Sequence, residues 1–279
     1  MESAEQRAKA EAFRALHAGP RILVLPNAWD AASARVFEEA GFPAIATTSG
    51  GVAAVFGYPD GERVPLADVL RIVERIAAVV RVPVTADMEA CGAPSAERVA
   101  ETVRRTIAAG AVGINLEDST HAGERALTDV GRQVELLQEA RRATGAAGVP
   151  IVINARTDVY LRGSGEAGER FDEAVRRANA YRRAGADCLF LIGVRDGLTI
   201  ERLVRAIDGP VNVVGGPGAL PVPELERLGV RRVSIASGAS RASLALVERI
   251  ATELRATGTY GAMEQKTMTH AKVNALFER

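Results

Sequence analysis

Acidic side chains gather directly after consecutive short apolar segments of the chain, and an arginine follows the next segment. These residues are Asp87, Glu89, Glu117, Asp118, Arg156 and Asp158. If the segments are neighbouring parallel strands, the groups converge at one end of a sheet. Clustered carboxylates repel one another unless a cation joins them, and oxygen ligands suit Mg²⁺ or Mn²⁺. The pattern predicts a site for a hard divalent cation, with loop caps and salt bridges as the alternative explanation. Asp87 and Glu89, two residues apart, would point the same way on a strand.

Glycine-rich turns follow other apolar segments and could bring backbone N–H groups close to an anion. Ser49, Gly50 and Gly51 form one such turn, and residues 215–219 (GGPGA) and 237–240 (SGAS) form two later ones. Glycine allows the close approach that an anionic ligand needs, although a plain tight turn explains the same residues. The two later turns contain no basic side chain that could pair with a phosphate, so the support for phosphate binding there is weak.

The usage of lysine, cysteine and histidine narrows the chemistry. Lys9, Lys266 and Lys272 all lie outside the predicted strand–helix units, so a Schiff-base mechanism is not expected. The histidines and cysteines are scattered without the spacing of zinc ligands. Cys91 has no nearby histidine to activate its thiol and is expected to be an incidental loop residue. His121 lies in a predicted loop, where it could act as an acid or base or simply be solvated.

The segments that must position these groups alternate between short apolar runs and longer charged runs with helical spacing. The apolar runs do not alternate with polar residues, which is typical of parallel strands covered on both faces. They span residues 22–26, 44–48, 82–86, 112–116, 151–155, 188–192, 211–214 and 233–236. Four charged runs end in a glycine that can turn the chain at a helix terminus. These glycines are Gly41, Gly110, Gly185 and Gly229.

Eight strand–helix units predict an α/β fold, a (β/α)8 TIM barrel with an extra C-terminal helical segment. An open doubly wound sheet is the competing fold, but it more often carries G-x-G-x-x-G after its first strand. This chain reads PNAWDAAS there. We expect a barrel domain with an N-terminal helix over residues 1–258. Residues 259–279 are expected to form a helical extension that packs on the barrel or on another subunit.

Composition excludes several classes of protein. The chain has 279 residues, of which 47% are hydrophobic and 25% charged, and its formal net charge is zero. With no basic excess, neither nucleic acid nor a membrane surface is an expected partner. An apolar signal core and a run long enough to span a bilayer are both absent from the sequence. Two cysteines offer no disulfide framework, so we expect a cytoplasmic protein.

The order of short motifs along the chain resembles the isocitrate lyase/phosphoenolpyruvate mutase superfamily. The motifs run LPNAWDAASARVFEEAGFPAIATTSGG, GYPDG, ADMEA, GINLEDS, NARTD and NVVGGPG, and the resemblance extends from about Arg21 to Gly258. It implies a (β/α)8 barrel that binds Mg²⁺ and a 2-oxo acid at its mouth. It also implies a homo-oligomer, a dimer or more usually a tetramer, whose subunits exchange a C-terminal helix.

The same resemblance implies a role for each matching acidic residue. Asp87 and Glu89 match the pair that holds Mg²⁺, directly or through water, and Glu117 matches a further acid of that metal site. Asp60, within GYPDG, matches a loop acid near the metal and the substrate and is an expected catalytic residue.

Substrate contacts are implied in the same way. Ser49, Gly50 and Gly51 match a turn that binds the carboxylate or oxyanion of the substrate. Arg156 matches an arginine that contacts the substrate, and Asn212 matches a polar residue at the end of the seventh predicted strand. Ser49 and Arg156 are therefore also expected to be catalytic.

The chain departs from the family pattern in two places. After Glu117 it reads DSTHAGERALTD, without the cysteine and lysine of isocitrate and methylisocitrate lyases and without the gating-loop Lys and Asn-Ser pair of phosphonate mutases. Residues 90–94 read Ala-Cys-Gly-Ala-Pro, where relatives usually read Ala-Gly-Tyr-Gly or Thr-Gly-Tyr-Gly. The second departure predicts a substrate pocket of altered shape near the metal.

Together these features predict a Mg²⁺-dependent lyase acting on a small 2-oxo (di)carboxylic acid, with Mn²⁺ as an alternative metal. It would cleave a C–C bond, by decarboxylation or retro-aldol reaction, through a metal-stabilised enolate. Oxaloacetate is the first expected substrate, because decarboxylation needs no cysteine acid. The alternatives are a phosphonate P–C bond mutase or hydrolase, a 2-oxo acid binding protein that has lost its chemistry, and a phosphate-ester barrel enzyme.

Overall fold

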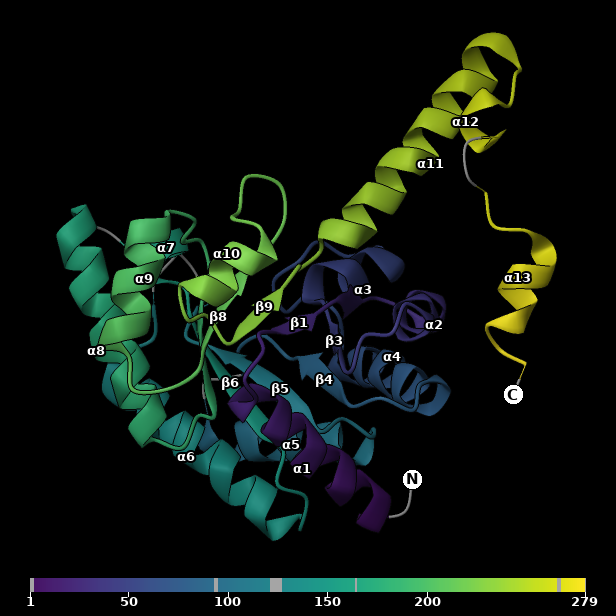
Figure 1. Ribbon diagram of the computed structural model, residues 1–279. Coiled ribbons are helices and arrows are strands. Elements are labelled where there is room, and N and C mark those ends of the chain that lie inside the picture. The colour runs from purple at the N-terminus through teal and green to yellow at the C-terminus, as the bar shows by residue number, and fades with distance from the viewer. Residues whose placement is uncertain (1–2, 93–94, 121–126, 164, 265–266, 279) are drawn as a thin grey trace.

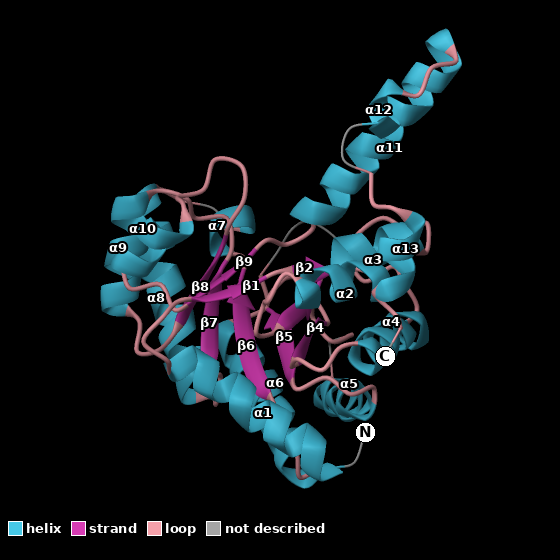
Figure 2. Ribbon diagram, turned by 45° about the vertical axis from the view of Figure 1, so that its right-hand side comes forward, coloured by secondary structure: helices cyan, strands magenta, loops and turns pink. Residues whose placement is uncertain are grey.

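The computed structural model describes residues 3–92, 95–120, 127–163, 165–264 and 267–278, and it confirms the predicted barrel. Nine strands form one sheet in the order β1-β9-β8-β7-β6-β5-β4-β3-β2, and every pairing is parallel. The strands are β1 (Leu23–Leu25), β2 (Asn27–Ala28), β3 (Ile45–Thr47), β4 (Val84–Asp87), β5 (Gly113–Glu117), β6 (Val152–Thr157), β7 (Cys188–Leu191), β8 (Val211–Val214) and β9 (Arg232–Ser234). They occupy the centre of the molecule, with helices around them (Figures 1 and 2).

The first barrel strand is split: the strand predicted over residues 22–26 contains β1, and the second piece, β2, lies beyond its end. Strands β1 and β2 are separated only by Pro26, which has no N–H group to donate to a ladder. Strand β1 pairs with β9, while β2 pairs with β3. Because these two short strands are consecutive in the chain, the sheet closes into a barrel through them, and the competing open sheet is excluded.

Three strands run further toward their carboxyl ends than the sequence predicted. Strands β4, β5 and β6 end at Asp87, Glu117 and Thr157 and not at the preceding apolar residues. The backbone ladder continues through the polar residues, as the pairing of Glu117 with Arg156 shows. Asp87, Glu117 and Arg156 thus lie on strands, where the rigid sheet fixes their direction.

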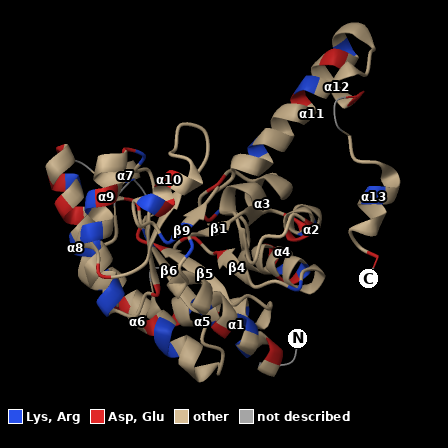
Figure 3. Ribbon diagram, in the orientation of Figure 1, with Lys and Arg blue, Asp and Glu red and all other residues tan. Residues whose placement is uncertain are grey.

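Most of the helices that surround the barrel bury one face and expose charged residues on the other. They are α2 (Ala31–Glu39), α3 (Ser49–Val55), α4 (Leu66–Val79), α5 (Ala96–Ala108), α6 (Val130–Ala146), α7 (Val159–Arg162), α8 (Ala167–Arg183), α9 (Gly197–Ala206) and α10 (Val222–Arg227). Basic and acidic residues are interspersed along α6 and α8 (Figure 3). The four predicted helix-terminal glycines are confirmed, since each adopts a positive φ between 87° and 108°.

Helix α1 (Ser3–Ala18) packs against the amino-terminal end of the barrel. Its Phe13 is fully buried, and a Cβ added at Gly113 of β5 would lie 2.7 Å from the Phe13 ring. Gln6 of the same helix donates to the carbonyls of Ile107 and Ala111. This end of the barrel is therefore filled by side chains, and the carboxyl end is the one available for a ligand.

The C-terminal segment contrasts with the rest of the chain. Helix α11 (Gly238–Thr257) extends away from the barrel (Figure 1), and Ser240 is its one buried residue. Two short helices follow, α12 (Gly261–Glu264) and α13 (His270–Ala275). Arg35 of α2 donates its Nε–H to the carbonyl of Leu276, which ties the end of the chain to α2. The boundary between residues 258 and 259 stays a prediction. No helix in the described part of the chain is both long and apolar enough to cross a membrane.

Candidate active site

Asp87 ends strand β4, and both oxygens of its carboxylate are hydrogen bonded. Oδ2 accepts from the backbone N–H of Ser49 (3.1 Å), and Oδ1 accepts from Asn115 Nδ2 (3.2 Å). The backbone N–H of Asp87 itself donates to Thr47 Oγ1 (2.8 Å). The side chain remains partly exposed. Asp87 is thus held in one direction at the carboxyl end of the barrel while it stays accessible to a ligand.

Glu89 lies beyond the end of β4, so the expectation that it shares a strand with Asp87 is wrong. Its backbone is left-handed, with φ 52°, and its carbonyl accepts from the N–H of Glu117 (2.9 Å). Its carboxylate Oε2 accepts from the backbone N–H of Glu62 (2.7 Å). The two acids nevertheless reach the same place, because both line one cavity.

That cavity has a volume of ≈560 Å³ and opens beside the barrel mouth. Its lining includes Ser49, Asp87 and Glu89, together with Cys91 and Glu62. Three predicted site residues are therefore brought together, although Glu117, Arg156 and Asn212 are not among the lining residues. Within the described ranges, no three or more His, Cys, Asp or Glu side chains are grouped so that they could hold a metal ion by themselves.

Arg156 on β6 is held between two carboxylates. Its Nη1 lies 2.7 Å from Glu117 Oε2, while its Nε and Nη2 bond the two oxygens of Asp158 at 2.6 and 2.9 Å. Burial alone would lower the pKa of Arg156, but Glu117 and Asp158, and then Asp87, raise it overall. The guanidinium is permanently charged and also lies 5.9 Å from the centre of the Phe190 ring.

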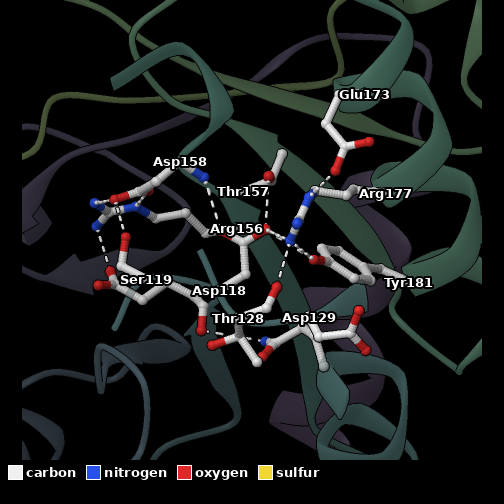
Figure 4. Close-up of polar contacts among 12 residues, drawn as sticks. Asp118, Ser119, Thr128, Asp129, Arg156, Thr157, Asp158, Glu173, Arg177 and Tyr181 are labelled. Carbon is white, nitrogen blue, oxygen red and sulfur yellow. Dashed lines mark hydrogen bonds and ion pairs between the residues drawn. The ribbon is translucent and has the colours of Figure 1, made fainter. Parts of the chain in front are cut away.

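Asp118 does not join the other acids, which corrects the expectation that all of them meet at the mouth. Successive residues of a strand point to opposite faces, so Glu117 faces inward and Asp118 faces the outer helices. Asp118 Oδ2 accepts from Thr157 Oγ1 (2.7 Å), Arg177 Nη1 (3.0 Å) and Tyr181 Oη (2.7 Å), as Figure 4 shows. Burial raises the pKa of Asp118 although these partners oppose that shift. This residue joins the sheet to helix α8.

The Ser-Gly-Gly segment forms the first turn of helix α3 and is not a plain loop. Thr48 precedes the helix with an extended backbone, and its carbonyl accepts the first helical hydrogen bond, from Val52. The N–H groups of Ser49, Gly50 and Gly51 therefore lie at a helix start. That of Ser49 is used by Asp87, as described above.

Asp60 is exposed, yet it lies against the start of α3. A Cβ added at Gly50 would be 3.1 Å from Asp60 Oδ2 and 3.6 Å from Ser237, which follows β9. A Cβ added at Gly51 would lie 2.6 Å from Thr48 and 2.9 Å from Trp29. Close packing therefore requires glycine at position 51, whereas a side chain at position 50 would displace only the exposed Asp60 carboxylate.

A layer of polar side chains crosses the barrel interior below Asp87. Asn154 Nδ2 donates to Asn115 Oδ1 (2.8 Å), and Arg232 Nη2 approaches the same oxygen at 3.4 Å. Asn212 is fully buried, and neither its Oδ1 nor its Nδ2 has a hydrogen-bond partner among the described residues. Its predicted role in substrate binding stays a prediction.

Four residues of this site were not among those predicted from the sequence. Asn115 donates to Asp87, Arg232 approaches Asn115, Glu62 contacts Glu89, and Ser119 donates to Asp158 Oδ2 (2.5 Å). Asn115 was detectable, because it lies two residues before Glu117 and so shares its inward face. Glu62 had no such signal, because its position depends on how a loop folds back.

The remaining sequence predictions have mixed outcomes. Cys188 is fully buried in the core. The Cys91 thiol is also buried, and desolvation, followed by the nearby carboxylates, raises its pKa well above the usual value. This shift favours the neutral thiol over the thiolate. His121, and residues 93–94 of the altered segment, lie outside the described residues.

The family model for phosphoenolpyruvate phosphomutase matches residues 13–255. The chain belongs to this family. The resemblance to the isocitrate lyase/phosphoenolpyruvate mutase superfamily, inferred above from the motifs, is thereby confirmed. The chain is an enzyme of that superfamily of lyases and mutases.

Individual members of the superfamily are similar over most of the chain. A 2-methylisocitrate lyase of Escherichia coli is 32% identical over 277 residues, covering 96% of this chain and 90% of that protein. An oxaloacetate decarboxylase of Bradyrhizobium diazoefficiens is 30% identical over 236 residues, covering 82% of this chain and 78% of that protein. A crystal structure of a Burkholderia cenocepacia J2315 protein superposes with a TM-score of 0.92 at 38% identity, over 98% and 97% of the two chains.

Proposed function

We propose that this protein is a Mg²⁺-dependent lyase that cleaves a C–C bond of a small 2-oxo dicarboxylic acid, with oxaloacetate as the first substrate to test. The observation that carries the proposal is the convergence of Ser49, Asp87 and Glu89 on one cavity, with a charged Arg156 held by Glu117 at the carboxyl ends of the neighbouring strands β5 and β6. A cation site next to a fixed guanidinium is suited to a substrate that carries carboxylate and keto oxygens. The similar oxaloacetate decarboxylase supports the choice of substrate.

The described residues fit Mg²⁺ better than a metal that needs a full set of protein ligands. Mg²⁺ usually keeps several waters and takes only one or two carboxylates from the protein. Asp87 and Glu89 would be those carboxylates, while Glu117, paired with Arg156, would contribute through water. When bound, the metal would hold the carboxylate and keto oxygens of the substrate and stabilise the negative charge that develops on the keto oxygen.

The protein's own groups would orient the substrate. Arg156 would bind a substrate carboxylate, and it needs no reorganisation because Glu117 and Asp158 already fix its guanidinium. The N–H groups of Gly50 and Gly51 would face the substrate from the start of α3, with Asp60 beside them. Asn212 would donate its amide from strand β8. The exposed apolar residues of α11 support a homo-oligomer as part of the same proposal.

Asp87→Ala tests the metal site directly. We expect Mg²⁺-dependent formation of pyruvate from oxaloacetate to fall by more than about 100-fold, because a metal's charge stabilisation contributes several kcal/mol and each 1.4 kcal/mol is tenfold in rate. The product is measured by NMR against a background of metal without protein. Asp68→Ala, which removes an acid of α4 that pairs with Arg71, is the matched control and should change the rate by less than about twofold.

The same assay decides among the alternatives. Methylisocitrate, 2,3-dimethylmalate and phosphonopyruvate are offered in parallel with oxaloacetate. If Asp87→Ala retains full Mg²⁺-dependent turnover, the proposed metal site is wrong. Turnover of phosphonopyruvate alone selects P–C bond chemistry, and tight binding of a 2-oxo acid without any turnover selects a binding protein.

A further inference from the structure

Two loops at the barrel mouth contain an unusual concentration of left-handed residues. Four non-glycine residues in the described part of the chain have positive φ, and three of them are Glu62 (55°), Glu89 (52°) and Cys91 (58°). Such a conformation costs about 1–3 kcal/mol per residue and persists only where surrounding contacts enforce it. The contacts that enforce it here join the two loops to each other.

Glu62 provides both of those contacts. Its backbone N–H donates to Glu89 Oε2 (2.7 Å), and its own carboxylate Oε1 accepts from the backbone N–H of Gly92 (2.8 Å). Within the second loop, the N–H of Cys91 donates to the carbonyl of Met88 (2.8 Å) and closes a turn. Glu62 thus holds the Glu89 side chain, near the start of this turn, and the Gly92 backbone, at its end.

The turn is also fixed to the scaffold on its other side. Thr102 of helix α5 donates its hydroxyl to the carbonyl of Cys91 (3.1 Å), and the N–H of Glu117 donates to the carbonyl of Glu89 (2.9 Å). The sheet and α5 hold one side of the turn, and Glu62 holds it from the cavity side. Glu62 lines the same cavity as Asp87 and Glu89.

We propose that Glu62 is a positioning residue that fixes the Glu89 carboxylate and the 89–92 turn in the geometry that binds the divalent cation. The inference rests on the proposed function of Glu89 as a metal acid. Groups that orient a metal's ligands typically contribute 10–100-fold to metal affinity. A residue that only stabilised the loop would leave that affinity unchanged.

Glu62→Ala and Glu62→Gln separate positioning from charge. The Gln variant keeps an oxygen at the Oε1 position that can accept from Gly92, whereas the Ala variant removes it. The matched control is Glu101→Ala, which deletes an acid that lines the same cavity but pairs with Arg105 on α5. For each variant we would measure the affinity for Mn²⁺ alone, by electron paramagnetic resonance, and hydrogen exchange of the 88–92 segment without metal.

We expect Glu62→Ala to weaken Mn²⁺ binding by about 10-fold or more and to accelerate exchange of the Gly92 amide. Glu62→Gln should stay within about threefold of the native affinity with slow exchange, and Glu101→Ala should match the native protein. Native Mn²⁺ affinity in Glu62→Ala, or equal weakening in the Ala and Gln variants, overturns the proposal. Absence of Mn²⁺ binding in the native protein would instead overturn the proposed function, while exchange at Gly92 still reports whether Glu62 holds the turn.

Discussion

The two polar regions of the barrel differ in how completely their groups are hydrogen bonded. The outer network consists of Asp118, Thr157, Arg177 and Tyr181, and the inner layer consists of Asn115, Asn154, Asn212 and Arg232. In the outer network Asp118 accepts from all three partners and from the N–H of Asp158. In the inner layer buried side-chain atoms of Asn154, Asn212 and Arg232 have no partner among the described residues.

This difference separates a region whose polar groups are satisfied within the protein from one whose polar groups are not. A buried polar group without a partner destabilises the fold, so the inner layer is not explained by stability. The outer network joins the strand ends to α8, and Figure 4 shows Asp118 enclosed by its partners. The inner layer instead lies below Asp87, to which Asn115 is bonded. The type of side chain does not distinguish the two regions, but the completeness of its hydrogen bonding does.

Arg177→Met breaks the outer network and should have the largest effect on stability. Asp118 would remain buried without its charged partner, and removal of one member of a buried pair costs about 3–5 kcal/mol. The free energy of unfolding is measured by urea denaturation. Arg176→Met, at the adjacent exposed position, loses only a surface pair with Glu173 and should cost less than about 1 kcal/mol. If both variants lost the same unfolding free energy, the outer network would contribute no more stability than an exposed surface ion pair.

His17 links the inner layer to pH. Burial, followed by the charge of Arg232, lowers the pKa of His17 to about 4. Its Nδ1 donates to the carbonyl of Phe13, so Nε2 is the nitrogen that accepts from Arg232. Below the ordinary histidine pKa of 6.5 the unfolded chain takes up a proton that the folded protein refuses. Stability is therefore lost as the pH falls from 6.5 toward 4.

Between pH 7 and pH 5 this single group should remove about 2 kcal/mol from the free energy of unfolding. His17→Gln keeps an acceptor for Arg232 but does not titrate. From pH 7 to pH 5 the unfolding free energy of this variant should therefore fall by about 2 kcal/mol less than that of the native protein. Urea denaturation at both pH values measures the difference. Parallel pH curves for the two proteins would show that His17 does not carry this dependence.

Arg232→Met should have the smallest effect on stability and provides the direct comparison with Arg177→Met. Arg232 is fully buried, desolvation lowers its pKa to about 10, and its Nε lacks a partner among the described residues. An apolar residue in place of a buried charge without a carboxylate partner removes the cost of desolvating that charge. We expect a change of less than about 1 kcal/mol in the urea-derived free energy. A loss as large as that of Arg177→Met would show that the inner layer is as structural as the outer network.

Much of the fold was predictable from the sequence because it depends on local patterns. Unalternating apolar runs indicated parallel strands, and glycines at helix ends indicated the turns between units. The motifs with Asp87, Glu89 and Arg156 identified the superfamily and the strands that carry its polar groups. The strand ends were less predictable, because apolar composition stops before the backbone ladder does, as at Asp87 and Glu117.

Only the tertiary structure decided which of these groups face a common cavity. Glu117 and Asp118 are adjacent and both acidic, yet one pairs with Arg156 and the other with Arg177 outside the barrel. Register fixes this choice, since a shift of one residue on a strand reverses its side chains. The contact of Glu62 with Glu89 depends on a loop that returns to the mouth after 27 residues of sequence separation. Sequence thus determined which chemical groups are available, and the closed, register-fixed sheet determined which of them meet.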